Sequence, residues 1–287
     1  MNNQIFWLTS YPKSGNTLLR SILISLFFTK EGLFSLEDAK NIMQFDITVL
    51  LKNNKNILGQ DFNKLQNMSI LYKYMDKLQS KESLKFNQDF IFLKTHSGLF
   101  EIGGNPFTRP ESTRGIIYIV RDPRDVVLSN ANHFGISNQE STNMMINMES
   151  YEIENFDTQN KKEFRRSLMG SWSSNYLSWK NYKGRKIHLI KYEDLVENPN
   201  KYFTKMLEYM KSIFPLNIDR DKIEKSIEET AFHKLQNLEN QEGFIEKGVG
   251  KFFRKGKVGE WKEKLEPKLS KQIEHHFKKE MLDLNYI

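Results

Sequence analysis

Four short apolar runs, each followed by polar or turn residues, constrain the fold of this chain more than any other feature. They cover residues 5–9, 90–95, 115–120 and 187–191. Runs of this length are typical of strands that are buried on both faces of a parallel sheet. Helical patterns lie between them, and this alternation favours an α/β fold with helices on both faces of one central parallel sheet.

Local signals place helices between these runs. After Asn16, apolar residues recur with a helical period, so one face of a helix is expected to pack on the sheet: Leu18, Leu19, Ile22, Leu23, Leu26 and Phe27. Asp122-Pro123 supplies an N-cap and a proline at the first helical position, which predicts a second helix. A longer amphipathic helix before the fourth strand is expected from five large side chains: Phe164, Leu168, Trp172, Trp179 and Tyr182.

The chain of 287 residues has no internal repeat and no linker-like stretch, so we expect a single domain over residues 1–287. Residues 35–88 and 136–163 are less regular and fall between strands. Cap or lid elements over an α/β active site are commonly inserted at such places, and we expect both segments to be elements of this kind.

Composition narrows the function classes. The absence of cysteine excludes disulfides, thiolate zinc sites and a cysteine nucleophile. The N-terminus lacks the basic region of a signal peptide, and the apolar segment 18–28 contains Arg20 and is too short to span a bilayer. We therefore expect a cytoplasmic enzyme. The net charge of +7 indicates an anionic partner, although a lysine-rich solvated surface explains it equally well.

A loop from Tyr11 to Thr17 connects the first expected strand to the first expected helix. Backbone N–H groups at a helix N-terminus bind an anion through unsatisfied donors and the helix dipole. Lys13 adds a mobile charge, and Ser14 and Thr17 add hydroxyls. The loop is not a Walker A motif, because that motif places its lysine after the second of two glycines, whereas Lys13 precedes the only glycine, Gly15.

Two other strand ends carry polar side chains. Arg121 ends the third expected strand, and Ser129 follows Asp122 by about two helical turns, so the pair suits a second phosphate or, equally, a capped surface helix. Lys94-Thr95-His96 closes the second strand, where ligands of parallel sheets bind. A histidine at this place can act as a general base near neutral pH.

Residues 243–259 hold five glycines interleaved with basic residues, a composition that suits either a lid closing on phosphates or a mobile surface loop.

Six segments, in order from residue 11 to residue 261, resemble motifs of the sulfotransferases that use 3′-phosphoadenosine 5′-phosphosulfate (PAPS). Residues 11–17 are similar to the family's 5′-phosphosulfate loop, and residues 120–129 are similar to its 3′-phosphate motif. Lys94-Thr95-His96 is similar to its catalytic lysine-threonine-histidine. The remaining matches resemble two adenine contacts and the lid over the 3′-phosphate: residues 191–195, 230–232 and 253–261.

The resemblance implies a single-domain α/β fold with a P-loop-like phosphosulfate-binding loop. It implies sulfuryl transfer from PAPS to a hydroxyl or amine of a small-molecule acceptor, with adenosine 3′,5′-bisphosphate as the product. His96 is then the general base, Lys13 stabilises the leaving group and Lys94 stabilises the transferred group. The residues implied in PAPS binding are Lys13, Ser14, Gly15, Asn16, Thr17, Leu18, Arg121, Ser129, Tyr192, Thr230, Phe232, Arg254, Lys255 and Gly256. No metal or nucleic-acid partner is expected, and no membrane span.

The sequence also departs from the family pattern. Leu18 stands where many relatives carry a tryptophan that stacks on adenine, so we expect Tyr192 and Phe232 to hold the adenine. After Trp261 the chain lacks the dimerisation segment of cytosolic animal members, which leaves the oligomeric state open. Residues 35–88 and 136–163 resemble the family only slightly, and we expect them to select the acceptor.

Three alternatives stay open. A nucleotide kinase or another phosphotransferase would need a Walker A lysine and a magnesium-holding acid. A basic nucleic-acid-binding protein would gather its basic residues on one face beside exposed aromatic side chains. A family member without catalysis would only bind nucleotide, and the presence of Lys13 and His96 argues against it.

Overall fold

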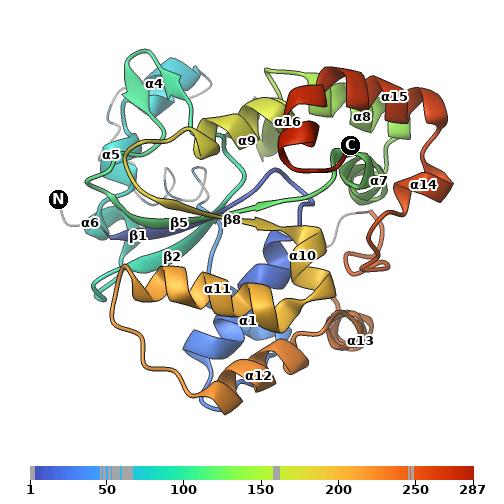
Figure 1. The fold of residues 1–287 in the computed structure, drawn as a ribbon. Helices are drawn as coiled ribbons and strands as arrows, with labels where there is room; N and C mark the ends of the chain where they lie inside the picture. Colours follow the sequence, from blue (N-terminus) through green and yellow to red (C-terminus); the bar gives the residue numbers. More distant parts are fainter. Residues whose placement is uncertain are drawn as a thin grey trace. The chain divides into compact units, whose positions relative to one another are not determined.

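The computed structural model contains a central parallel sheet of four strands in the order β2-β1-β5-β8, flanked by helices (Figure 1). The strands are β1 (Ile5–Thr9), β2 (Ile91–Thr95), β5 (Thr113–Val120) and β8 (Ile187–Lys191). β1 pairs in parallel with both β2 and β5. The α/β fold and its four strands are therefore confirmed, and β5 begins two residues earlier than expected.

The structure describes residues 4–45, 67–157, 162–244 and 249–287, together with residues 47, 50, 53, 59 and 246. Contacts divide the chain into two compact units, which are described separately below. The first unit is formed by residues 1–11, 44–118 and 147–187, and the second by residues 12–43, 119–146 and 188–287. The expectation of a single domain stays a prediction.

The first unit packs aromatic side chains against β1, all of whose residues are fully buried. The ring of Trp7 lies 5.5 Å from that of Phe45 and 5.4 Å from that of Phe107, and Phe107 in turn lies 6.1 Å from Trp179. The other elements of this unit are α4 (Met68–Tyr72), α5 (Met75–Leu78), α6 (Lys81–Leu84), β3 (Glu101–Ile102), β4 (Asn105–Pro106), β6 (Tyr151–Asp157), β7 (Lys162–Leu168) and α9 (Trp172–Lys180).

The long helix expected from Phe164 to Tyr182 is wrong. Phe164 and Leu168 lie in β7, which pairs with β6 in an antiparallel hairpin, and only residues 172–180 form a helix. Gly170 adopts a φ of 68°, which separates the strand from the helix. The N-cap of this helix is Ser171, whose hydroxyl accepts a hydrogen bond from the Ser174 N–H at 3.0 Å.

The second unit contains the two helices that were predicted from local signals. α1 (Asn16–Phe28) buries Leu19, Ile22, Leu23 and Leu26, and α7 (Pro123–Phe134) starts with a proline. The Asp122 side chain caps α7 by accepting a hydrogen bond from the Arg124 N–H at 2.9 Å. Its other elements are η1 (Leu36–Asn41), α8 (Asn138–Ile146), α10 (Tyr192–Glu197), α11 (Pro199–Lys211), α12 (Arg220–Glu229), α13 (Phe232–Glu242), α14 (Trp261–Lys264), α15 (Pro267–His276) and α16 (Lys278–Asp283).

The two expected cap segments are described only in part. Residues 46–66, apart from 47, 50, 53 and 59, lie outside the described residues, as do residues 158–161. The described parts include η1, α4, α5, α6, α8 and the β6–β7 hairpin. Their role over the acceptor stays a prediction. None of the helices in the described part of the chain has both the length and the apolar character needed to cross a bilayer.

Candidate functional site

The loop before α1 has an unusual backbone that is fixed by its neighbours. Lys13 adopts a φ of 62° and Gly15 a φ of 100°, both in the left-handed region. A Cβ on Gly15 would lie 3.0 Å from Cε2 of Tyr192, and closer still to its Cδ2. Only glycine fits there, because the buried Tyr192 ring packs directly on the loop.

Arg121 connects the loop to two other predicted site residues. Its Nη1 donates to the Lys13 carbonyl oxygen at 3.4 Å, and its Nη2 donates to the Lys257 carbonyl oxygen at 3.3 Å. Its guanidinium lies 4.4 Å from the centre of the Tyr192 ring. Burial raises the pKa of the Tyr192 hydroxyl, and the nearby Arg121 charge acts in the opposite direction. The loop, Arg121 and Tyr192 therefore form one cluster within the second unit.

Two polar atoms in this cluster are suited to a ligand. The hydroxyl of Ser14 and the Nε of Arg121 are both buried, and neither has a hydrogen-bond partner among the described residues. A buried donor without a partner costs about 1–3 kcal/mol, and a ligand oxygen that accepted from it would remove that cost. Both groups can donate to an oxyanion, which fits a site for phosphate or sulfate groups.

Lys13 contacts the segment expected to be a lid. Its ammonium lies 3.7 Å from the centre of the Phe252 ring and 3.4 Å from Nδ1 of His133 on α7. Because an ammonium only donates, this contact makes Nδ1 of His133 the acceptor. The lysine is therefore held against the aromatic part of the 243–259 segment.

Asp125, which lies on α7, binds the C-terminal end of the same segment. Its carboxylate accepts hydrogen bonds from the Gly259 N–H at 2.7 Å and the Trp261 N–H at 2.9 Å. Burial raises the pKa of the Asp125 carboxyl, whereas the Arg121 charge and the two N–H groups act in the opposite direction. The Val249 N–H also donates to the His133 carbonyl oxygen at 3.0 Å. Residues 245, 247 and 248 of this segment lie outside the described residues.

Glu246 connects the start of the same segment to α1. Its carboxylate pairs with the buried Arg20 at 2.6 Å and accepts a hydrogen bond from the Thr17 hydroxyl at 3.4 Å.

The three predicted lid residues have different surroundings. Gly256 has a φ of 61°, and a Cβ there would lie 2.8 Å from Cδ1 of Phe232, so Phe232 packs on this glycine. Arg254 and Lys255 both bind Glu260, the first at 3.0 Å through Nη1 and the second at 2.9 Å through Nζ. Burial alone raises a carboxyl pKa, but the hydrogen bonds from Arg254 and Lys255 lower the pKa of Glu260 to about 2.

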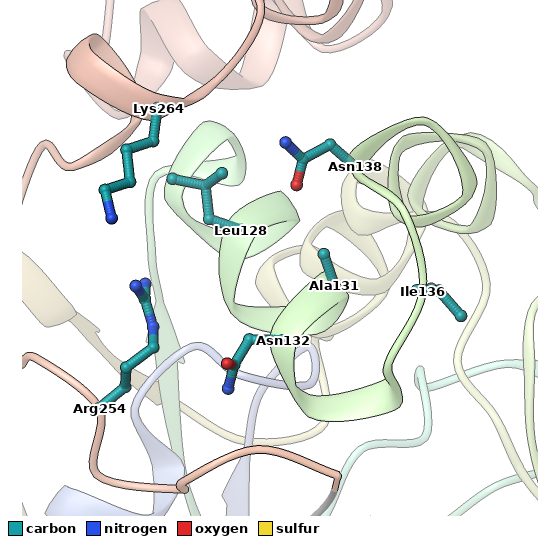
Figure 2. Close-up of a pocket in the computed structure, with 7 residues that line it drawn as sticks. All are labelled: Leu128, Ala131, Asn132, Ile136, Asn138, Arg254 and Lys264. Carbon is teal, nitrogen blue, oxygen red and sulfur yellow. The ribbon is translucent and has the colours of Figure 1, made fainter.

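A pocket of about 320 Å³ lies beside this ion cluster (Figure 2). Figure 2 shows Arg254 and Lys264 pointing toward each other on one side, opposite Leu128, Ala131 and Asn132 of α7. Ile136 and Asn138 complete its lining.

The remaining predicted nucleotide residues lie in the second unit. Leu18 is half-buried in the first turn of α1, Asn16 begins that helix, and Ser129 is half-buried on α7. Thr230 is buried at the end of α12, where its hydroxyl donates to the Ser226 carbonyl oxygen at 2.7 Å.

His96 and Lys94 lie in the first unit, both buried at the carboxyl end of β2. Nδ1 of His96 lies 2.9 Å from the Ser10 carbonyl oxygen. A carbonyl oxygen only accepts, so Nδ1 carries the hydrogen, and in the neutral ring Nε2 carries the lone pair. This tautomer is the one that a general base at Nε2 requires.

A buried asparagine that the motifs did not indicate holds the His96 segment in place. Asn175 on α9 donates through Nδ2 to the carbonyl oxygens of His96 at 3.0 Å and Met169 at 2.8 Å. Its Oδ1 accepts from the Tyr118 hydroxyl at 2.9 Å. Sequence reasoning missed Asn175, and it also missed Asp125, Phe252 and Glu260. The last three lie within or next to the family-like motifs at residues 120–129 and 253–261, whereas Asn175 gives no local signal.

The sequence model of a protein family described as "Sulfotransferase domain" matches residues 3–285 of the chain. The chain belongs to the sulfotransferase family. It is 26% identical over 284 residues to sulfotransferase 1E1 of Rattus norvegicus, covering 96% of this chain and 82% of the relative. It is 25% identical over 286 residues to cytosolic sulfotransferase 17 of Arabidopsis thaliana, covering 94% and 72%. The chain is therefore a sulfotransferase enzyme.

Solved structures of sulfotransferases share its fold. Mouse sulfotransferase SULT7A1 complexed with PAP aligns with a TM-score of 0.59 at 18% identity, covering 98% of this chain and 86% of that one. Retinol dehydratase in complex with androsterone and the inactive cofactor PAP aligns with a TM-score of 0.61 at 17% identity, covering 98% and 81%. No group of three or more histidine, aspartate or glutamate side chains suited to a metal is present in the described part of the chain.

Proposed function

We propose that this sulfotransferase transfers a sulfuryl group from PAPS to a hydroxyl or amine of a small-molecule acceptor. One observation carries the proposal: residues 12–17 of the loop, Arg121, Tyr192 and the described part of residues 249–261 meet in the second unit, beside the buried Ser14 hydroxyl and Arg121 Nε. The names of solved relatives, in which PAP is bound, support the same co-substrate.

The residues of the second unit would form two phosphate sites, one for each phosphate-bearing end of the nucleotide. The backbone N–H groups of the loop, the Ser14 hydroxyl and the Thr17 hydroxyl would hold the 5′-phosphosulfate end. Arg121, Ser129 and the lid residues Arg254, Lys255 and Gly256 would hold the 3′-phosphate, while Asn16, Leu18, Thr230 and Phe232 would line the nucleoside. PAPS supplies the sulfuryl group, and the chain supplies orientation and charge.

His96 would accept the proton of the attacking acceptor atom at Nε2. The new bond forms between that atom and sulfur, while the bond between sulfur and the 5′-phosphate oxygen breaks and its electron pair stays on that oxygen. Lys13 would neutralise the charge on the leaving oxygen, and Lys94 would stabilise the transferred group. The transition state is loose, so positioning and charge stabilisation would contribute most of the rate.

A thermal-shift titration tests the co-substrate. We expect adenosine 3′,5′-bisphosphate to raise the melting temperature more than AMP or ATP at equal concentration, because only the bisphosphate engages both phosphate sites. A preference for ATP would support a phosphotransferase instead, and equal effects of the three nucleotides would overturn the proposal.

Two statements stay predictions: a cytoplasmic location and the absence of a nucleic-acid partner. The acceptor and the oligomeric state are not assigned. An acceptor screen with labelled PAPS, using phenols, aliphatic alcohols, sugars, lipids and amines, addresses the first of them.

A further inference from the structure

A buried carboxylate gathers three cations beside the proposed 3′-phosphate site. Glu260 is 8% exposed and binds Arg254 at 3.0 Å, Lys255 at 2.9 Å and Lys264 at 3.4 Å. Arg254 and Lys255 belong to the lid motif, whereas Lys264 lies at the end of α14, four residues after Glu260. The cluster is local to the second unit and uses only described residues.

The cluster carries more positive charge than its carboxylate can neutralise. Three cations and one carboxylate leave a net charge of +2 among these four side chains. The carboxylate is almost fully buried, while the side chains of Arg254, Lys255 and Lys264 are 30%, 38% and 47% exposed. The three cations are therefore held in place on one side and accessible to a ligand on the other.

This excess charge matches one class of group. A phosphate monoester carries about −1.5 to −2 charges at pH 7 and offers three acceptor oxygens. A phosphate diester or a sulfate ester carries only one negative charge, so it would leave part of the cluster charge uncompensated. A terminal phosphate, such as a nucleotide 3′-phosphate, is the better match.

The adjoining pocket gives such a group room. It has a volume of about 320 Å³, and Arg254 and Lys264 line one side of it (Figure 2). The opposite side is formed by Leu128, Ala131 and Asn132 of α7 (Figure 2). The Asn132 side chain, which lines the same pocket, donates to the Lys251 carbonyl oxygen at 3.3 Å, and so joins this side of α7 to the lid.

We propose that Lys264 is a further specificity-determining residue, which together with Arg254 and Lys255 forms a Glu260-anchored subsite for a terminal phosphate dianion. This inference rests on the proposed function, because the dianion is taken to be the 3′-phosphate of the nucleotide. Glu260 sets the spacing of the three cations, and Lys264 supplies one of the two charges that the dianion needs.

The test compares Lys264→Gln with Lys262→Gln. Both variants remove one exposed lysine charge from α14, but Lys262 takes no part in the Glu260 cluster. Calorimetric titration measures the Kd of adenosine 3′,5′-bisphosphate and of AMP for each variant and for the unchanged enzyme. Melting temperatures without ligand confirm that both variants are folded.

We expect Lys264→Gln to weaken binding of the bisphosphate about fivefold and to leave AMP binding unchanged, because a charge-assisted contact to the 3′-phosphate is lost. Its affinity should also fall less steeply with salt than that of the unchanged enzyme. Lys262→Gln should match the unchanged enzyme.

Equal bisphosphate affinities for the two variants, or an equal loss for both nucleotides in Lys264→Gln, would overturn the role of Lys264 alone. If the unchanged enzyme showed no preference for the bisphosphate over AMP, the proposed function itself would fail. The two failures are therefore distinguishable.

Discussion

Replacing Gly15 by alanine perturbs the loop before α1 at the point where its geometry is most constrained. The residue has a φ of 100°, which costs a non-glycine residue about 1–2 kcal/mol. The added Cβ would also meet Cε2 of Tyr192 at 3.0 Å and Cδ1 of Ile119 at 3.3 Å. Tyr192 is only 5% exposed and Arg121 covers its ring, so the ring cannot move away freely.

Overpacking of this kind costs about 1–3 kcal/mol, so the total loss of unfolding free energy should be about 2–5 kcal/mol. Gly104→Ala is a suitable control, because Gly104 has a φ of 77° but a Cβ there would meet nothing within 4 Å. Urea unfolding of both variants measures the difference, which isolates the steric contact with Tyr192.

A double-mutant cycle with Tyr192→Ala sharpens the same test. If the ring causes the clash, Gly15→Ala should cost about 1–3 kcal/mol less in the Tyr192→Ala background than in the unchanged enzyme. Equal costs in both backgrounds, together with a cost no greater than that of Gly104→Ala, would refute the packing argument.

Three further predictions concern catalysis, nucleotide binding and acid stability. His96→Ala should lower kcat about 10²- to 10⁴-fold, as loss of a general base does, with an unchanged Kd for the bisphosphate; retained turnover would remove His96 from this role. Arg121→Ala should weaken bisphosphate binding relative to the exposed control Arg220→Ala, and unchanged affinity would mean that the 3′-phosphate site is misplaced. Glu260→Gln should lower the free energy of unfolding at pH 7. The upper bound is about 3 kcal/mol, calculated from a Glu260 pKa that falls from 4.5 to about 2. We expect a loss of about 1–2 kcal/mol, because the partial exposure of the cationic partners weakens the interaction. Because the folded pKa lies below the unfolded one, this contribution is complete above about pH 4.5 and disappears as the pH falls toward 2, so urea unfolding of the two proteins should converge there; a constant difference would contradict the linkage.

The strands and the loop that connects β1 to α1 were predictable because their signals are local. A short apolar run such as Ile5–Thr9 is typical of a buried central strand, and Asp122-Pro123 indicates the start of a helix. The failed helix near residue 170 had local signals too. Gly170 favours the end of a strand and Ser171 an N-cap, and these two residues outweigh the helical spacing of the large apolar side chains.

The supporting contacts could not be predicted, because they join residues far apart in sequence. Asp125 accepts from Gly259, 134 positions away, and Asn175 holds His96, 79 positions away. A single sequence shows no pairing at such distances. Lys264 is different, since it follows Glu260 by four residues in a helix, and this spacing brings opposite charges together.

The packing of Tyr192 bears on which side chains can contact adenine. With Leu18 in place of a tryptophan, Tyr192 and Phe232 were expected to hold the base, yet Tyr192 is 5% exposed, with Gly15 on its ring and the Arg121 guanidinium 4.4 Å away. A ring covered in this way offers little surface for stacking. Phe232 is half-buried and packs on Gly256 of the lid. Tyr192 therefore packs on the loop and on Arg121, and the adenine contacts expected of Tyr192 and Phe232 stay predictions.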